Sequence, residues 1–221
     1  MMDIEIQSMW KTYDASITLG CIEADVEVVK YDEQLWHKIN TYTEKLQDSL
    51  NTDDIAFQPN IAAARRVYKV IGQDPARYRL SAEALLRRIV KGKALYQINN
   101  VVDIVNVVSL YTGISIGGYD TEHIQGNVCF GLGEANEPYE AIGKGQYNSA
   151  HLPVLRDDKG AFGTPTSDSK RTAVRPETTS FLMVFFGFTG TQNLESNMKW
   201  AADLLLEHGG SSNPVIHKEL L

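Results

Sequence analysis

Apolar residues recur at intervals of three and four in much of the first half of the chain, a spacing that predicts amphipathic helices. Leu35, Ile39, Tyr42, Leu46 and Leu50 form one such apolar face. The predicted helices cover residues 32–50, 62–71, 81–90 and 99–111, with Ser81 as an N-cap and Gly72, Gly92 and Gly113 as helix ends. The last of these helices is apolar on most sides, so we expect it to be buried.

The second half changes to short apolar runs separated by Gly, Pro, Asn and Asp, which is typical of strands and turns. Predicted strands cover residues 17–30, 127–132, 139–142, 151–155 and 181–188, with a hairpin turn at 157–160 and a closing helix over 194–207. This order favours an α+β fold with helices packed on a mostly antiparallel or mixed sheet. We expect residues 1–60 to form an N-terminal strand-helix layer and residues 61–221 the main domain, together one compact unit.

The composition is that of a globular protein. The chain has 221 residues, of which 43% are hydrophobic and 22% charged. Its longest apolar run, residues 181–188, is far shorter than the roughly 20 residues that span a bilayer. Cys21 and Cys129 are isolated, and the histidines lack metal-ligand spacing. No secretory signal is visible, so we expect a cytoplasmic protein without a membrane partner, metal or cofactor.

Positive charge is concentrated in residues 61–93, although the net charge of the chain is −7. This segment holds nine basic residues against Asp74 and Glu83, which gives it a net charge of +7 and leaves −14 for the rest. The cations either line the solvated faces of two helices or attract a phosphate backbone. The candidate RNA-contacting residues are Arg65, Arg66, Lys69, Arg87, Arg88, Lys91 and Lys93.

Polar residues interrupt the apolar helix predicted over residues 99–111. Asn99, Asp103 and Asn106 are one helical turn apart in succession and should share a face. A buried polar stripe needs partners, because an unpaired buried amide costs about 1–3 kcal/mol. These residues therefore either cap the helix and bond a neighbouring loop, or line a ligand pocket.

Common nucleotide-binding and nucleophile motifs are absent. The GxG pieces at residues 131–133 and 143–145 lack the full GxGxxG pattern, and neither GxxxxGK[ST] nor GxSxG occurs. The run SDSKRT at residues 167–172 is dense in hydroxyls and cations. It is either a cradle for a phosphate or carboxylate or a solvated connection.

Three motifs occur in order: NNVVDIVN, GGYDTEHIQG and RTAVRPETT. Over residues 65–190 the chain resembles the editing domain of the phenylalanyl-tRNA synthetase beta subunit, and most closely its stand-alone relatives, usually described as tRNA-binding-domain proteins. In the synthetase this α+β domain hydrolyses tyrosine wrongly esterified to the phenylalanine tRNA. The resemblance implies tRNA or aminoacyl-tRNA as a partner.

The resemblance carries over at some positions and fails at others. Asp103 and Asn106 match a helix motif whose Asn lines the editing pocket, and Asp120 matches a turn-and-strand motif. Gly117 stands where the bacterial synthetases have a His, and Val184 where they have a Glu thought to recognise the tyrosine hydroxyl. An apolar Val184 offers no partner to a phenol, so the resemblance does not imply tyrosine specificity here.

The first functional hypothesis is a free-standing hydrolase of mischarged aminoacyl-tRNA. Its catalytic candidates are Asn106, Thr172 and Glu177, which would orient a water or the amino group. Gly117 and Gly118 either let a ligand approach the backbone, where their amides would stabilise an oxyanion, or permit a tight turn.

Two further hypotheses use the same residues differently. The chain is either a non-catalytic tRNA-binding module or a binder of a free amino acid or similar metabolite, with Arg171 facing a carboxylate and Glu177 an ammonium. The pocket candidates are Asn99, Asp103, Asn106, Gly117, Gly118, Asp120, Arg171, Thr172 and Glu177.

Overall fold

The computed structural model describes residues 2–13, 15–135 and 137–221, and has the predicted α+β architecture. The helices are α1 (Glu33–Ser49), α2 (Pro59–Val70), α3 (Ser81–Val90), α4 (Asn100–Thr112) and α5 (Leu194–His208), with short 3-10 helices at Ser8–Tyr13, Ile55–Phe57 and Thr121–His123. The strands are β1 (Ile4–Ile6), β2 (Ile17–Asp25), β3 (Ile116–Asp120), β4 (Val128–Leu132), β5 (Pro138–Ala141), β6 (Gly145–Asn148), β7 (Pro153–Asp157), β8 (Gly160–Thr164), β9 (Ser167–Asp168), β10 (Ser180–Phe188) and β11 (Val215–Leu220).

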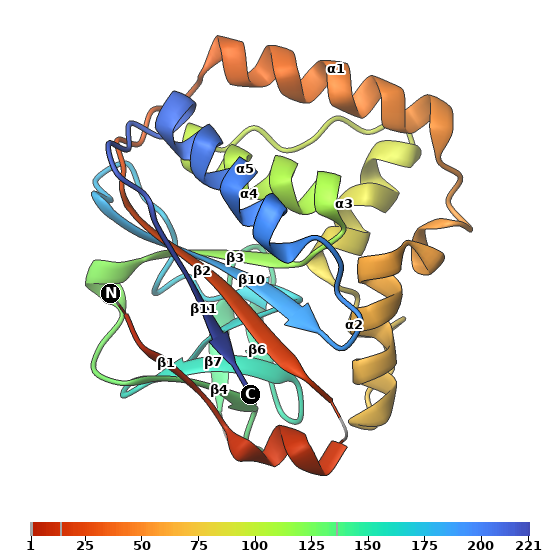
Figure 1. Ribbon diagram of the computed structural model, residues 1–221, viewed down its shortest axis with the longest axis vertical. Coiled ribbons are helices and arrows are strands. Elements are labelled where there is room, and N and C mark those ends of the chain that lie inside the picture. The colour runs from red at the N-terminus through yellow and green to blue at the C-terminus, as the bar shows by residue number, and fades with distance from the viewer. Residues whose placement is uncertain (1, 14, 136) are drawn as a thin grey trace.

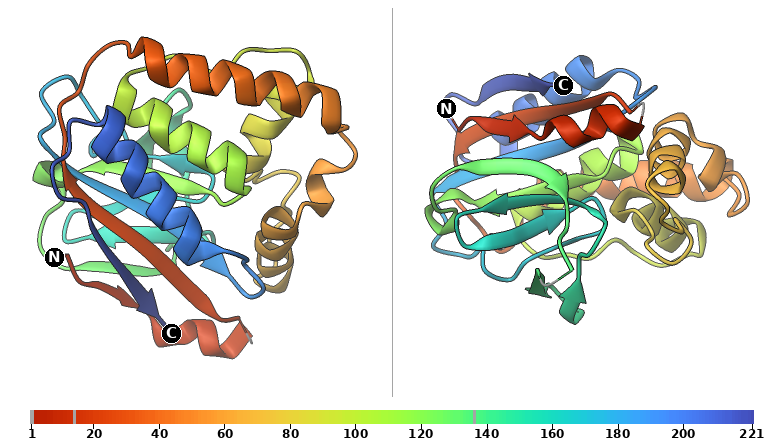
Figure 2. Two further views of the ribbon diagram at one scale, coloured as in Figure 1. Left: turned by 45° about the horizontal axis from the view of Figure 1, so that its top comes forward. Right: turned by 90° about the horizontal axis from the view of Figure 1, so that it is seen from below.

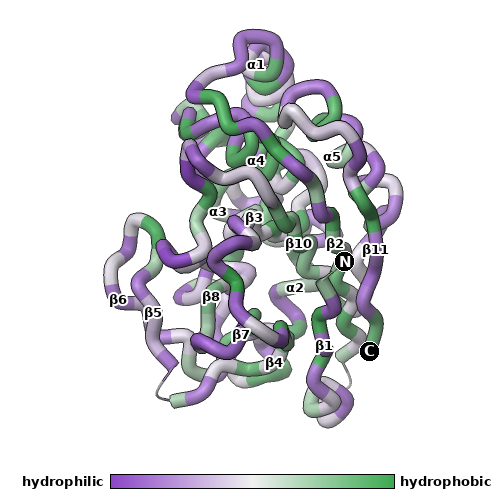
Figure 3. The backbone as a smooth tube through the Cα atoms, turned by 90° about the vertical axis from the view of Figure 1, so that its left-hand side faces the viewer, coloured by the Kyte–Doolittle hydropathy of each residue, from purple (hydrophilic) through white to green (hydrophobic). Residues whose placement is uncertain are grey.

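Two sheets form the body of the molecule. An antiparallel sheet has the order β11-β2-β10-β3, and α4 and α5 cover one of its faces, with α1 outside them (Figure 1). The mixed sheet β1-β4-β7-β8-β9 lies on the side away from α4 and α5. In the right-hand view of Figure 2, α2 and α3 lie at one end of the molecule, beside both sheets. The small β5–β6 hairpin stands at the periphery (Figure 3).

The helix predictions are confirmed because local signals define each helix. The Asp32 side chain caps α1 by accepting from Leu35 N–H (2.8 Å), and Asn99 caps α4 by accepting from Val102 N–H (2.8 Å). Gly113 ends α4 in the left-handed region at φ 68°. As expected, α4 is buried along most of its surface. No helix in the described ranges is long and apolar enough to cross a membrane.

Some local predictions were wrong. Ser81 is not an N-cap: Leu80 holds that position, and the Ser81 N–H donates to the Pro165 carbonyl instead (2.9 Å). Gly117 and Gly118 do not form a tight turn but lie inside β3, paired with β10. Strands β1, β3, β6, β8, β9 and β11 were not predicted.

The N-terminal segment contributes strand β2 to the interior of the antiparallel sheet. Strand β2 lies between β10 and β11, and the main hydrophobic cluster includes residues from both sides of residue 60. Strand β2 and the core residues before residue 60 therefore share a sheet and a core with the rest of the chain, and the division into residues 1–60 and 61–221 stays a prediction.

Candidate nucleic-acid interface and the predicted pocket

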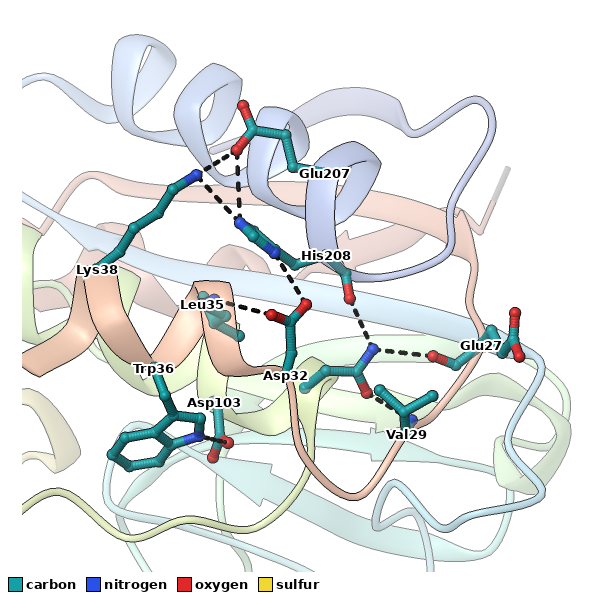
Figure 4. Close-up of polar contacts among 10 residues, drawn as sticks. Glu27, Val29, Asp32, Leu35, Trp36, Lys38, Asp103, Glu207 and His208 are labelled. Carbon is teal, nitrogen blue, oxygen red and sulfur yellow. Dashed lines mark hydrogen bonds and ion pairs between the residues drawn. The ribbon is translucent and has the colours of Figure 1, made fainter.

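The polar residues at the start of α4 hold the helix in the fold. Buried Asp103 accepts hydrogen bonds from Trp36 Nε1–H (2.7 Å) and from the backbone N–H of Ile98 (3.0 Å), and Figure 4 shows the contact with Trp36. Burial raises the pKa of Asp103, although both hydrogen bonds favour the carboxylate. Asn99 is occupied by the helix cap. Two of the three predicted pocket residues on this helix thus have structural partners.

The neighbouring Asn100 ties α4 to two other segments. Its amide accepts from Val29 N–H (2.9 Å) and donates to the carbonyls of Glu27 (2.9 Å) and His208 (2.7 Å). In contrast, Asn106 is partly exposed, and no hydrogen bond joins its side chain to another residue that the structure describes. Asn106 is therefore the α4 candidate whose side chain is free to contact a ligand.

Asp32 links the start of α1 to the end of α5. One carboxylate oxygen caps α1, and the other lies 2.9 Å from His208 Nδ1 (Figure 4). Burial opposes ionisation, but hydrogen bonds from the Leu35 N–H and from His208 hold the pKa of Asp32 below its usual value. This contact fixes the outer helix layer over α4.

The backbone at Gly117 is covered by a tyrosine rather than open to a ligand. Gly117 pairs with Val184 across β3 and β10, and both residues are buried. A Cβ on Gly117 would lie 2.0 Å from the Tyr119 hydroxyl, and one on Gly163 would lie 2.2 Å from it. On the opposite face, a Cβ on Gly118 would press on Val105 of α4. The glycines make room for neighbouring side chains.

The Tyr119 hydroxyl contacts an acidic residue that was not predicted from the sequence as part of the site. It donates to Asp168 Oδ1 (2.8 Å), and burial raises the pKa of Tyr119 well above its usual value. Burial also raises the pKa of Asp168 to about 7, although the Tyr119 hydrogen bond and the nearby Lys144 favour its charged form. The positions are far apart in sequence, so no local pattern signals the pair.

The second and third motifs meet around Asp120. Its carboxylate accepts from Thr178 Oγ1–H (2.7 Å) and from the Glu122 N–H (3.0 Å), and its own N–H donates to the Thr172 carbonyl (2.9 Å). The Thr172 side chain is fully buried, and its hydroxyl has no hydrogen-bond partner among the described atoms. A buried hydroxyl without a partner costs about 1–3 kcal/mol, so this atom is a candidate ligand contact.

Arg171 and Glu177 differ in whether their charge is available to a ligand. Arg171 donates to both carboxylate oxygens of Asp157 (2.8 and 2.9 Å), so its guanidinium is already neutralised. Glu177 is exposed and makes no ion pair with a described residue. A hollow of about 550 Å³ lies beside Arg171, where Lys170 is also paired, with Glu140. The loop at residues 167–172 therefore borders a hollow, but its cations already form ion pairs with acids of this chain.

One acid neutralises two of the predicted RNA-contacting cations. Glu83 of α3 is buried and accepts from Arg65 of α2 (2.8 Å) and from Arg87 (2.9 Å). The i, i+4 spacing of Glu83 and Arg87 was visible in the sequence, whereas the contact with Arg65 depends on the packing of α2 against α3. The Arg65 contact joins α2 to α3, whereas the Arg87 contact lies within α3.

The other predicted cations remain available to a partner. Arg66, Lys69, Lys91 and Lys93 are exposed and form no ion pair with an acid in the described part of the chain. Arg88 is half-buried, and its guanidinium lies 3.7 Å from the centroid of the Tyr96 ring. The available charge thus lies along α2, the end of α3 and the segment that follows. Sequence reasoning did not single out Tyr96.

A model of the B3/4 domain matches residues 63–204, which is more than half of the chain. The chain belongs to the B3/4 domain family. B3/4 is a domain of the phenylalanyl-tRNA synthetase beta-subunit family.

Sixteen chains of known structure match the B3/4 chain, among them a synthetase fragment. The crystal structure of an N-terminal fragment of the phenylalanyl-tRNA synthetase beta-subunit from Pyrococcus horikoshii is 12% identical, with a TM-score of 0.43. The match covers 92% of this chain and 51% of that chain, so the B3/4 chain spans about half the length of that fragment. No curated protein matches the sequence.

Proposed function

We propose that this B3/4 protein binds RNA of the tRNA class through the exposed cations of α2, the end of α3 and residues 91–93. The observation that carries the proposal is the availability of Arg66, Lys69, Lys91 and Lys93 in a chain whose net charge is −7. Phosphate backbones are bound by such unpaired cations, and the family supplies the tRNA connection.

Titration of fluorescently labelled tRNA transcripts at about 50 and about 200 mM salt tests the proposal. For about four neutralised phosphates, we expect saturable binding whose affinity falls about a hundredfold between these salt concentrations. The absence of binding at the lower salt concentration would refute the proposal. Binding that does not depend on salt would refute the assigned cations.

Hydrolysis of mischarged aminoacyl-tRNA is the second candidate function, and the unpartnered hydroxyl of buried Thr172 favours it. A hydroxyl retained without a partner suits a group that orients a substrate or an attacking water. Asn106 and Glu177, the other catalytic candidates, also have side chains without hydrogen-bond partners among the described residues, and no hydrogen bond joins either to Thr172 in that part of the chain. The support for hydrolysis therefore rests on Thr172 alone.

Replacement of Thr172 by Val separates a catalytic hydroxyl from a structural one. Because the hydroxyl has no partner, T172V should fold with unchanged or higher stability. If the hydroxyl orients the reacting groups, T172V should lower the rate of deacylation, measured over a panel of mischarged tRNAs, by about 10²-fold or more. Equal rates for wild type and T172V, or no activity above buffer, would exclude this role.

A further inference from the structure

We propose that Tyr96 is a stacking platform for an unpaired base of the bound RNA, with Arg88 holding the ring and Lys91 and Lys93 contacting the flanking phosphates. The inference rests on the proposed RNA-binding function and names the part of the RNA that is recognised. It assigns a role to residues 91–98, which run as an irregular segment from the end of α3 to the start of α4, beneath α1 (Figure 1).

Two contacts with the core hold the backbone of this segment in place. Leu95 is 5% exposed and anchors the middle of the segment in the main hydrophobic core. The backbone N–H of Ile98 is held by buried Asp103 (3.0 Å). Between and beside these anchors, Tyr96 and Ile98 are 54% and 52% exposed. The segment therefore presents large side chains to solvent from a fixed backbone.

Arg88 fixes the ring of Tyr96. Its Nε–H donates to the Ala94 carbonyl (2.6 Å), which positions the guanidinium 3.7 Å from the centroid of the Tyr96 ring. The guanidinium lies over the ring, and 54% of Tyr96 is exposed, so part of the side chain remains accessible to a ligand. An aromatic ring held in this way loses little conformational freedom when a base stacks on it.

The charge along this run of the chain favours a polyanion over a protein surface. No Asp or Glu occurs from Ala84 to Val102, whereas Arg88, Lys91 and Lys93 all lie in this run. Proteins that bind single strands combine such cations, which track the backbone, with aromatic rings on which bases stack. An uncharged apolar partner would use Tyr96 and Ile98 but would leave the lysines without a role.

The test compares two probes that carry the same number of phosphates: a single-stranded oligouridylate of about 12 nucleotides and an abasic oligonucleotide of equal length. Both are labelled with fluorescein and titrated with the full chain at low salt. We expect the wild type to bind the oligouridylate more tightly than the abasic probe. Tyr96→Leu should lose about tenfold for the oligouridylate and little for the abasic probe, while Tyr96→Trp should retain the preference.

Tyr31→Leu is the matched control, since Tyr31 is 51% exposed and lies outside the segment. Circular dichroism and melting curves establish that each variant is folded. If the oligouridylate binds and Tyr96→Leu has no effect, the platform is wrong while RNA binding stands. If no RNA binds at low salt, both proposals fail. Self-association of the wild type that requires Tyr96 and does not respond to RNA would assign the surface to protein contact instead.

Discussion

At the scale of single residues, the ring of Tyr119 decides what the pocket region can hold. The sequence showed two adjacent glycines at 117 and 118 and could not show which side chain fills the space beside them. That side chain comes from the same strand, and its hydroxyl reaches Asp168 on β9. A ligand approaching Gly117 would have to displace a ring that is hydrogen-bonded at its far end.

The raised pKa of Asp168 predicts how stability changes with pH. In the folded state the carboxyl stays protonated up to about pH 7, whereas in the unfolded chain it ionises near its usual pKa of 3.8. The folded state then binds more protons between these values, so the contribution of Asp168 to stability is fully present below pH 3.8 and is lost as the pH rises to about 7.

Asp168→Asn keeps an acceptor for the Tyr119 hydroxyl and removes the titration. Relative to wild type, the variant should gain stability between pH 4 and 7 and keep the gain above pH 7. Allowing for partial exposure of the side chain, we expect about 1 kcal/mol, or about 2–4 °C in Tm. Differential scanning fluorimetry across this pH range measures the difference, with Asp53→Asn as an exposed control. A constant difference from pH 4 to pH 8 would contradict the assigned pKa.

At the scale of elements, the helices follow from local chemistry and several strands do not. Asn99 and Gly113 mark the two ends of α4 in the sequence itself. Strand β3 was missed because its glycines suggest a turn, and β11 because its partner β2 lies far away in the chain. The basic stretch was located correctly, yet the sequence could not show that Arg65 and Arg87 share Glu83, since that contact forms only when α2 packs on α3.

Glu83→Gln should loosen the junction of α2 and α3. The buried carboxylate receives hydrogen bonds from two arginines, and its neutral replacement leaves both charges without an anion. We expect a loss of about 2 kcal/mol, less than for a fully buried pair because the arginines are partly hydrated. Urea unfolding measures the change. Glu195→Gln, which breaks the exposed pair with Lys218, should leave the midpoint unchanged. An equal midpoint for Glu83→Gln would show that the junction does not depend on this charge.

At the scale of the whole molecule, the acidic body restricts where a polyanion can dock. Residues outside 61–93 carry a net charge of −14, so RNA is repelled from most of the surface and attracted to one region. This asymmetry was predictable by counting residues. The ion pairs of Arg65 and Arg87 with Glu83 could not be predicted in this way, and they leave fewer than seven of the predicted cations available to a partner.

Lys91→Gln combined with Lys93→Gln should weaken tRNA binding and lower the slope of log affinity against log salt by about 2, since each lysine releases about one counterion. The matched control is Lys11→Gln with Lys45→Gln, which removes two exposed lysines from elsewhere. Fluorescence anisotropy across a salt series measures both. Equal slopes for the two double variants would mean that the contact surface lies elsewhere.

The position of β2 between β10 and β11 has a consequence for biosynthesis. The second strand of the chain to be made cannot pair until residues near 180 have been translated, because its partners in the sheet are both late segments. At about 5–20 residues per second, that delay is on the order of ten seconds. During this delay, the apolar residues of β2 have no partner strands to pair with. We therefore expect a nascent chain of this protein to expose apolar strand residues for longer than a helical bundle of equal length would.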